Sequence, residues 1–293
     1  RAIESQSEGE GRSGMSEYGP SLTPRMRPIN PKRSTIVSVL DVGTSKVVCL
    51  IAELLPVSGA EALKGRSHKA RIIGLGHQRA RGVKGGAIID LEAAEHSIRL
   101  AIDAAERMAR VEVRSVIVNM TGGRLKSEAF TAEVSLRGQG VSDGDIRRVF
   151  EAMSFTGAES GRSVLHSLPT GFAIDETRHI RDPHGMIGER LGVDMHVLTS
   201  DEYAIRNLML AVERCHVGVE AVVASPYASG LSCLVDDEAE MGVAVVELGG
   251  GTTSVGVFSN GVLVHADAVA VGGNHITMDI ARGLSTGINH AER

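Results

Sequence analysis

The chain has 293 residues, 42% of them hydrophobic and 23% charged, which is typical of a globular protein with two or three domains. Its net charge of −5 and its 3% of aromatic residues argue against a base-stacking nucleic-acid surface and against attraction to anionic lipid. Three widely spaced cysteines, Cys49, Cys215 and Cys233, predict reduced and mostly buried thiols in a cytosolic protein. No uninterrupted apolar stretch approaches the length of a membrane span, and no histidine pair has the spacing of a zinc site.

The chain begins with a polar segment and then a hairpin. Residues 1–34 are rich in Ser, Gly, Pro, Arg and Glu, and we predict a disordered extension without a secretory signal. Residues 36–50 read IVSVLDVGTSKVVCL, in which one apolar strand ends at a carboxylate, Asp41. A turn with Gly43 and two hydroxyl residues, Thr44 and Ser45, then leads into a second apolar strand.

The next segments predict an α/β layer. A polar loop is expected over residues 56–70, and short strands over residues 71–76 and 115–120. Between these strands Asp90 is expected to cap a helix with one buried face. The apolar residues of that face recur at helical spacing: Leu91, Ala94, Ile98, Ile102, Ala105 and Ala109.

The pattern changes over residues 122–198, which predict a small α+β insertion. Ser142 and Asp145 have the spacing of a capping box, so a short helix should begin there. Pro169 lies within an extended segment and predicts an edge strand or a bend. The strands of the insertion are expected over residues 126–136, 163–175 and 191–198, with a turn at 182–185.

The α/β pattern then resumes. Thr199 and Glu202 predict a second capping box, on a helix that carries Ile205, Leu208, Val212 and Cys215. Further strands are expected over residues 219–224 and 262–271, and helices over residues 228–235 and through Ile276, Ile280 and Leu284. Two histidines in apolar runs, His196 and His265, are expected to be packed or surface residues rather than ligands.

A second hairpin is predicted over residues 243–258, which read VAVVELGGGTTSVGVF. Its first strand ends at Glu247, and three glycines at the tip let the backbone approach a ligand closely. Successive N–H groups in such a turn suit a phosphate, and a carboxylate beside it suits a phosphate-bound Mg²⁺. Either stretch alone is equally compatible with an ordinary Gly-rich turn. Two similar hairpins, however, suggest a duplicated unit that closes on one nucleotide from both sides.

Other nucleotide and catalytic motifs are missing from the sequence. It contains no P-loop, and the triple glycine is followed by a strand rather than by the helix of a dinucleotide-binding motif. No Ser-hydrolase elbow or Cys/His catalytic spacing is found either.

Taken together, these motifs resemble the actin/hexokinase/heat-shock-chaperone superfamily of ATPases and, within it, the FtsA family of bacterial cell-division proteins. The resemblance covers residues 37–293. It is carried by Asp41-x-Gly43-Thr44-Ser45-Lys46, by Lys84-Gly85-Gly86 with Asp90-Leu91-Glu92, by Ala211-Val212-Glu213-Arg214-Cys215 and by Glu247-Leu248-Gly249-Gly250-Gly251-Thr252-Thr253. The position of the insertion is the stronger discriminator, because the FtsA family places its small subdomain inside the first actin-like lobe.

The resemblance implies an actin-like α/β ATPase fold with an inserted α+β subdomain and an incomplete second lobe. The first lobe would comprise residues 35–121 and 199–236, the inserted interaction subdomain residues 122–198, and the start of the second lobe residues 237–293. The cofactors would be ATP and Mg²⁺. The cofactor-binding residues would be Asp41, Gly43, Thr44, Ser45, Lys46, Gly249, Gly250, Gly251, Thr252 and Thr253. Asp41 and Glu247 would hold the metal through water.

The resemblance also implies a cell-division protein that polymerises with itself and links the FtsZ ring to the cytoplasmic face of the membrane at the septum. Membrane attachment would use a C-terminal helix that this sequence does not contain, and residues 122–198 would recruit later division proteins. Glu247, the candidate catalytic residue, stands where the family usually has Asp, and Ser254 stands where it often has Asp, so slow or negligible hydrolysis is expected. The alternative is an active phosphotransferase or hydrolase of the same superfamily, although the sequence shows no carboxylate and aromatic cluster for a sugar.

Overall fold

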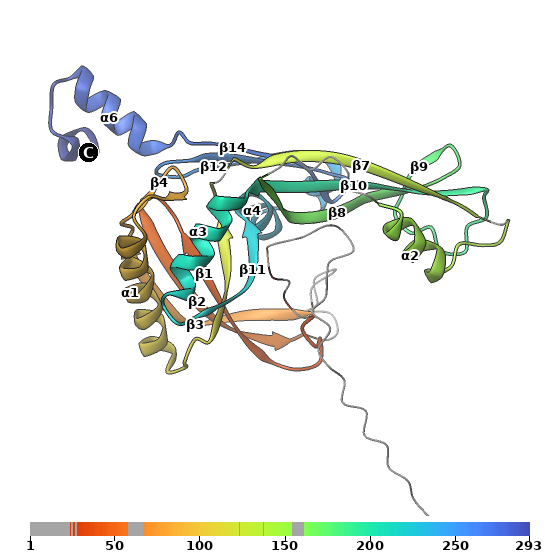
Figure 1. The fold of residues 1–293 in the computed structure, drawn as a ribbon, viewed down its shortest axis with the longest axis horizontal. Coiled ribbons are helices and arrows are strands. Elements are labelled where there is room, and N and C mark those ends of the chain that lie inside the picture. The colour runs from red at the N-terminus through yellow and green to blue at the C-terminus, as the bar shows by residue number, and fades with distance from the viewer. Residues whose placement is uncertain are drawn as a thin grey trace, which may run out of the picture.

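The computed structural model describes residues 24, 26, 28–57, 67–122, 124–136, 138–153 and 161–293. Most of the extension expected over residues 1–34, and most of the loop expected over residues 56–70, lie outside the described residues. The described part contains three larger sheets and one two-stranded sheet, with helices packed around them (Figure 1).

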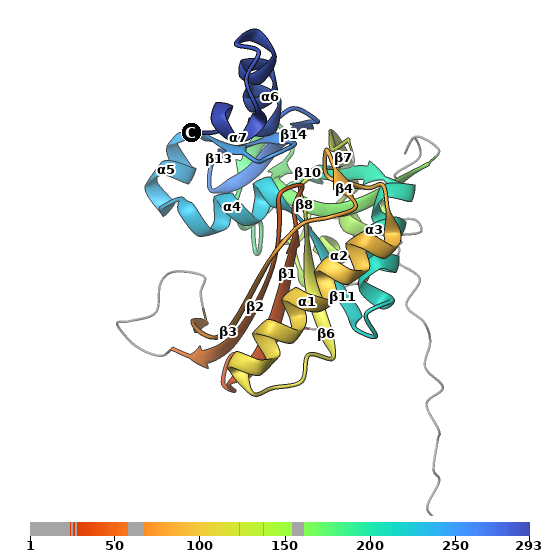
Figure 2. The same cartoon turned by 90° about the vertical axis from the view of Figure 1, so that its left-hand side faces the viewer.

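The largest sheet has five strands in the order β11-β6-β1-β2-β3. These strands are β1 (Thr35–Val42), β2 (Lys46–Pro56), β3 (His68–Arg79), β6 (Ser115–Met120) and β11 (Gly218–Ala224). The first three form an antiparallel meander, whereas β1, β6 and β11 are parallel. Helices α1 (Leu91–Ala109) and α3 (Glu202–Glu213) contact each other and the sheet (Figure 2). The predicted first hairpin is therefore confirmed, and the predicted strand over residues 71–76 is part of a longer strand, β3.

Two glycines of β3 bring α1 close to the sheet. A Cβ on Gly76 would lie 1.8 Å from the carbonyl oxygen of Ala101, and one on Gly74 would lie 2.5 Å from that of Ala105. The helix begins as predicted, because the Asp90 side chain accepts a hydrogen bond from the Ala93 N–H at 3.1 Å. A short hairpin of β4 (Val83–Lys84) and β5 (Ala87–Ile88), which the sequence analysis missed, connects β3 to this helix.

The insertion forms a second sheet, in the order β7-β10-β8-β9, that extends away from the first (Figure 1). Its strands are β7 (Lys126–Ser135), β8 (Arg162–Ile174), β9 (Thr177–Ile180) and β10 (Arg190–Asp201), and its helix is α2 (Asp143–Glu151). This sheet has a hydrophobic core of its own, centred on Val149, Leu191 and Val193. The capping box of Ser142 and Asp145 is confirmed at the start of α2. The small β9 strand was not predicted.

Pro169 lies in β8, in a part of the strand that pairs with β10 alone, because the pairing with β9 covers only Phe172 and Ile174. The pairing of β10 with β8 shifts at this point, because Asp194 opposes Gly171 whereas Met195 opposes Pro169. The extra residue, Thr170, forms the bulge that the proline requires, since proline donates no ladder hydrogen bond. The register shift confirms the predicted bend, and the missing β9 partner at Pro169 is consistent with the alternative of an edge position.

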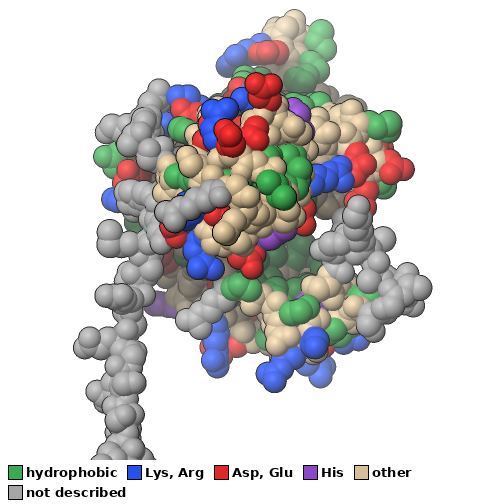
Figure 3. Space-filling view, turned by 90° about the vertical axis from the view of Figure 1, so that its right-hand side faces the viewer, with side chains coloured by type: hydrophobic (Ala, Val, Ile, Leu, Met, Phe, Trp, Pro, Cys, Tyr) green, Lys and Arg blue, Asp and Glu red, His purple; other side chains and the backbone are tan. Residues whose placement is uncertain are grey.

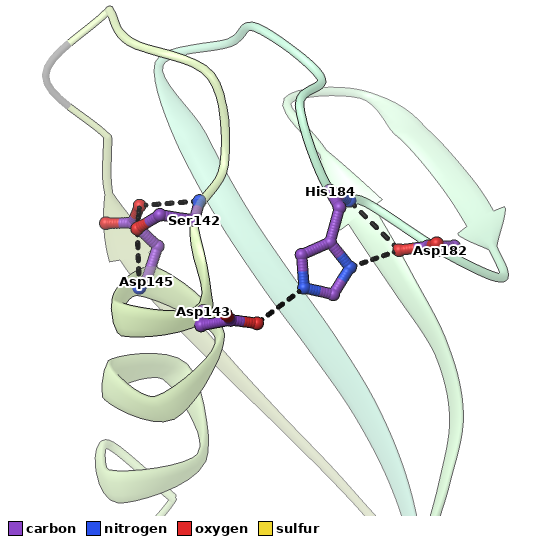
Figure 4. A network of polar contacts seen from close by, with 5 residues as sticks. All are labelled: Ser142, Asp143, Asp145, Asp182 and His184. Carbon is purple, nitrogen blue, oxygen red and sulfur yellow. Dashed lines mark hydrogen bonds and ion pairs between the residues drawn. The ribbon is translucent and has the colours of Figure 1, made fainter.

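A histidine joins α2 to the turn before β10 (Figure 4). His184 Nδ1 lies 2.5 Å from a carboxylate oxygen of Asp182, and its Nε2 lies 2.9 Å from one of Asp143. Ionised carboxylates only accept hydrogen bonds, so both ring nitrogens must carry protons for both contacts to form. These contacts raise the pKa of His184 and lower that of Asp182.

The third sheet contains the second predicted hairpin, which is confirmed. Strands β12 (Val243–Leu248), β13 (Thr253–Ser259) and β14 (Val262–Val269) are antiparallel in that order. Helices α4 (Ser225–Cys233) and α5 (Asp236–Met241) contact this sheet. Helices α6 (Gly273–Gly283) and α7 (Ile288–Ala291) contact each other and extend away from it (Figure 1). Helix α4 begins three residues before the expected position, with Pro226 in its first turn, and α5 and α7 were not predicted.

One serine hydroxyl connects the insertion to the third sheet. Ser127 Oγ in β7 donates to the Ala266 carbonyl oxygen at 2.8 Å and accepts from the Ala266 N–H at 2.7 Å. The same oxygen lies 2.9 Å from Nε2 of His196, which is 3% exposed. His196 is therefore packed, as predicted, whereas His265 is a surface residue.

Two sequence-based predictions need correction. Helix α3 is capped by Asp201, whose side chain accepts from the Ala204 N–H at 2.9 Å, so the capping box of Thr199 and Glu202 is wrong. Thr199 lies instead in β10, which runs three residues beyond the predicted end, and its hydroxyl accepts from Arg162 Nε. The cysteines are all free, but their burial differs: Cys49 is buried, Cys215 partly buried and Cys233 exposed.

The surface of the insertion is of mixed character. Figure 3 shows its free end, where acidic and basic side chains lie beside each other and beside small apolar areas. Ion pairs such as Arg178–Asp194, which is partly buried, and the exposed Arg190–Glu133 belong to this sheet. Among the helices that the structure describes, none is both long enough and apolar enough to cross a membrane.

Candidate functional site

The tips of the two hairpins meet. A Cβ on Gly251 would lie 2.6 Å from Cγ2 of Thr44, and one on Gly250 would lie 3.1 Å from Cβ of Ser45. The glycines are thus needed partly because the two turns pack directly against each other. Each turn is closed by a backbone bond, from Gly43 N–H to the Lys46 carbonyl and from Gly249 N–H to the Thr252 carbonyl.

A cavity of about 780 Å³ opens beside the two tips. Nine of the predicted site residues line it: Asp41, Gly43, Thr44, Ser45, Lys46, Glu247, Gly249, Gly250 and Thr252. Two predicted residues lie outside its lining. Gly251 packs against Thr44, and the Thr253 hydroxyl donates to the Val271 carbonyl at 2.7 Å. The structure therefore brings nearly the whole predicted set together, although that set is drawn from segments about two hundred residues apart.

The turns present donors to this cavity. Helix α6 occupies two carbonyl oxygens of the second turn, because Gly273 N–H donates to Gly249 O at 2.9 Å and Asn274 N–H to Gly250 O at 2.8 Å. No hydrogen bond within the described residues uses the N–H groups of Thr44, Ser45, Gly250 or Gly251. Lys46 is exposed beside them, and in the described part of the chain it forms no ion pair. Free N–H groups and a free cation are the groups that bind a phosphate.

Asp41 ends β1 at one side of the cavity. Asn119 Nδ2 donates to its Oδ1 at 2.9 Å, and no hydrogen bond in the described part of the chain uses its second oxygen. Burial raises the pKa of Asp41 above its ordinary value, and the nearby Glu247 carboxylate adds to this, while Asn119 and Lys46 act in the opposite direction. The charge of Lys46 therefore acts on Asp41 as well as on the cavity.

Glu247 ends β12 at the opposite side and is held by three serines. Ser225 and Ser229 of α4 donate to its Oε1 at 2.8 and 2.5 Å, and Ser254 of β13 donates to its Oε2 at 2.6 Å. Ser225 and Ser254 are buried. The carboxylate is thus fixed in place, and the side-chain length of Glu is what allows it to reach α4 from the end of β12.

The residues fit a hydrated Mg²⁺ better on one side than on the other. Next to Asp41, the Oδ1 atom of Asn119 is buried and has no hydrogen-bond partner. An orphaned amide oxygen and a free carboxylate oxygen are the acceptors that metal-bound water needs. At Glu247, two serines donate to Oε1 and one to Oε2, so only Oε2 has a single donor among the described residues. The described residues contain no group of three or more His, Cys, Asp or Glu side chains arranged for direct metal binding.

Sequence reasoning missed several of these residues. Asn119 interrupts a buried apolar strand with a polar side chain, and that signal could have identified it. Ser225 and Ser229 lie four residues apart on one face of α4, a spacing that could have marked them only once the helix was known to face Glu247. Apolar residues of the first sheet, Val39, Leu50, Ile117 and Val223, extend the cavity beyond the turns.

Comparisons with known proteins identify the family. A family model described as the SHS2 domain inserted in FtsA matches residues 122–199, and one described as cell division protein FtsA matches residues 244–293. A relative named cell division protein FtsA from Agrobacterium fabrum is 54% identical over 280 residues, which cover 96% of this chain and 62% of the relative. The protein of the same name from Escherichia coli K12 is 32% identical over 257 residues, 88% of this chain and 59% of the relative. The chain thus spans about three fifths of the length of these relatives.

A solved structure supports the fold. A chain of the PilM-PilN type IV pilus biogenesis complex is 15% identical, with a TM-score of 0.58 over 87% of this chain and 68% of that one. This likeness concerns the fold alone. The predicted actin-like α/β fold with an inserted α+β subdomain is confirmed. On the family models and the relatives together, the chain belongs to the FtsA family of cell division proteins.

Proposed function

We propose that this chain is the ATP-binding part of a cell-division protein in which the two hairpins hold the phosphates of one nucleotide. The observation that carries this proposal is the convergence of both turns on one cavity. Three of its lining residues, Thr44, Ser45 and Gly250, have N–H groups that no hydrogen bond of the described residues uses. Phosphate oxygens would accept from these groups on both sides, and Lys46 would supply a point charge. The apolar floor formed by the first sheet leaves room in the cavity beyond the phosphates.

In this proposal each carboxylate has a separate role. Asp41 and Asn119 would hold Mg²⁺ through its waters, and the metal would supply neutralising charge to the phosphates. Glu247 would orient the attacking water through Oε2, which among the described residues accepts only from Ser254. Because three serines fix Glu247 in place, it cannot follow the reacting phosphate, and in-line geometry matters to within about 1 Å. We therefore expect slow turnover, as suits a nucleotide-gated adaptor rather than a metabolic enzyme.

The cellular role that fits this site is that of the family. The protein would polymerise with ATP bound, capture FtsZ and attach it to the cytoplasmic membrane at the septum, and recruit later division proteins through the insertion. The relatives' name and the matched inserted domain support this role. The insertion also presents exposed apolar side chains, Met186 and Ile187, beside its charged surface.

The proposal is tested by measuring ATP affinity with isothermal titration calorimetry in the presence of Mg²⁺. Lys46→Ala should weaken binding about tenfold or more, because a hydrogen bond to a charged group contributes roughly 1.5–3 kcal/mol. Lys69→Ala removes the same charge from an exposed position in β3, outside the cavity, and should leave the affinity unchanged. Equal affinities of the two variants would contradict the proposed phosphate site.

The alternative of an active phosphotransferase or hydrolase is separated by turnover. Steady-state phosphate release should be slow, and small-molecule acceptors such as sugars should not accelerate it. Fast phosphate release, or release that depends on an acceptor, would contradict the adaptor role and indicate an enzyme that acts through the same cavity.

A further inference from the structure

A second cavity lies next to the hairpin tips. It has a volume of about 510 Å³ and is formed by segments of the two-stranded sheet, the insertion sheet and the third sheet, together with the connections beside them. The segments that line it are the β4–β5 turn, the connection from β6 to β7, the start of α3, the tip of the second hairpin, the end of β14 and the first turn of α6. A site assembled from so many separate segments is formed only in the folded chain.

Its polar side chains are mainly hydrogen-bond donors. Lys84 and Arg124 line the cavity, are exposed to solvent and take no part in any ion pair of the described residues. His275 Nδ1 accepts a hydrogen bond from the Gly272 N–H at 3.1 Å. A neutral imidazole that accepts at Nδ1 carries its proton on Nε2, so the other ring nitrogen is a donor.

One carboxylate, that of Asp201, also lines this cavity. It is engaged as the cap of α3, accepting from the Ala204 N–H at 2.9 Å. Arg162 stabilises the same region, since it donates to the Arg124 carbonyl at 2.7 Å and to Thr199 Oγ1 at 2.9 Å. The two positive charges of Lys84 and Arg124 outnumber the single negative charge of Asp201, so the formal charge of the lining residues is positive.

The wall between the two cavities is thin. Thr252 lines both of them and is 5% exposed. The Gly86 N–H donates to the Thr44 hydroxyl at 3.2 Å, which joins the β4–β5 turn to the first hairpin tip. A Cβ on Gly86 would lie 2.4 Å from Cα of Gly122, so the backbones that complete the wall are in direct contact.

We propose that this second cavity binds a tetrahedral oxyanion, with inorganic phosphate as its ligand. Two free cations and an imidazole N–H are donors from which a phosphate dianion accepts hydrogen bonds, and their residues line the cavity from three different segments. This proposal depends on the proposed function only for the origin of the phosphate, which hydrolysis of ATP in the neighbouring cavity would release. Binding of phosphate added to the solution needs no nucleotide at all.

The test is a phosphate titration of the 293-residue protein, followed through the His275 side chain by NMR after selective histidine labelling. The His275 signal should move saturably with phosphate and should not move with chloride at equal ionic strength. Replacing both cations, Lys84→Ala with Arg124→Ala, should raise the midpoint at least tenfold, because each contact is a hydrogen bond to a charged group. The absence of a saturable shift, or an unchanged midpoint in this variant, would overturn the proposal.

Two controls separate this site from the neighbouring cavity. Lys69→Ala with Arg114→Ala removes two exposed cations elsewhere, so its net charge equals that of the test variant, and its midpoint should match the parent. Lys46→Ala should also leave the His275 midpoint unchanged while it weakens ATP binding. If Lys46→Ala abolishes the His275 response, the anion lies in the hairpin cavity and the second site is refuted. If ATP fails to bind but the His275 response persists, the proposed function fails and this site stands.

Discussion

Replacement of Glu247 by Ala should destabilise the protein, because three serine hydroxyls donate to its carboxylate. A hydrogen bond to a charged group contributes about 1.5–3 kcal/mol, and a buried donor left without an acceptor costs about 1–3 kcal/mol. The three bonds share one partly buried carboxylate, so their losses do not simply add. We expect the free energy of unfolding to fall by about 2–4 kcal/mol.

Glu247→Asp should also destabilise, although it retains the charge. A side chain shorter by one methylene cannot keep contact with Ser225 and Ser229 on α4 and with Ser254 on β13 at once. This variant separates length from charge: if the reach of Glu limits turnover, Asp should hydrolyse ATP faster despite its lower stability. An unchanged rate in a variant that still binds ATP would show that the length of this side chain is not limiting.

The matched control is Glu240→Ala. Glu240 is an exposed carboxylate on α5 that pairs with Arg181 at 3.0 Å, and an exposed pair contributes about 0–1 kcal/mol. Urea denaturation followed by circular dichroism gives the free energies of unfolding for both variants. If Glu247→Ala is no more destabilising than Glu240→Ala, the serines do not anchor Glu247 and the reasoning fails.

Three further predictions follow from the packing and the histidines. Gly76→Ala should lower the melting temperature strongly, because its Cβ would lie 1.8 Å from the Ala101 carbonyl oxygen and α1 would have to move. Asp143→Asn should lower the pKa of His184, measured by NMR, because it removes one of the two carboxylates that raise this pKa. The contact between His184 and α2 should then be lost at a lower pH than in the parent. His166→Gln should reduce the loss of stability on acidification. Burial lowers the pKa of His166 to about 4, so between pH 6.5 and about 4 the unfolded chain is protonated at this histidine and the folded chain is not, which favours unfolding as the pH falls.

The controls for these predictions lie in the same chain. Gly283→Ala adds a Cβ that has nothing within 4 Å, so its melting temperature should match the parent; a loss equal to that of Gly76→Ala would refute the packing argument. The bond that raises the pKa of His184 stabilises at low pH and is lost as the pH rises through the raised value. A pKa of His184 that is the same in parent and Asp143→Asn would show that the contact does not form in solution. A parent whose stability is constant between pH 6.5 and about 4 would contradict the role of His166, which accepts from the Ala224 N–H at 2.9 Å.

Much of the fold could be predicted because its signals are local. The apolar alternation around Asp41 and Glu247, the Asp90 cap and the Ser142–Asp145 box each depend on residues within one turn or one strand. The β10 strand shows the limit of such reasoning. Thr199 and Glu202 have capping spacing, but the ladder with β8 continues to Asp201, whose own side chain then caps α3. Tertiary pairing therefore kept Thr199 in the strand and placed the cap at Asp201, which the sequence analysis did not predict.

The parts that could not be predicted depend on contacts between distant segments. The three serines around Glu247 come from α4 and β13, and only the packing of these elements brings them together. The junction of Ser127 with Ala266 likewise joins residues 139 positions apart. The role of Gly251 was predicted as backbone freedom at a ligand, whereas its contact with Thr44 shows that packing between the two turns also requires a glycine.

The central claim is that both hairpins contact the phosphates of one nucleotide, and amide NMR tests it most directly. ATP with Mg²⁺, added to the ¹⁵N-labelled protein, should shift the N–H signals of Thr44 and Ser45 together with those of Gly250 and Gly251. All four should follow one binding curve, because a single ligand would contact both turns. Shifts confined to one hairpin, or two hairpins that titrate with different midpoints, would contradict the account.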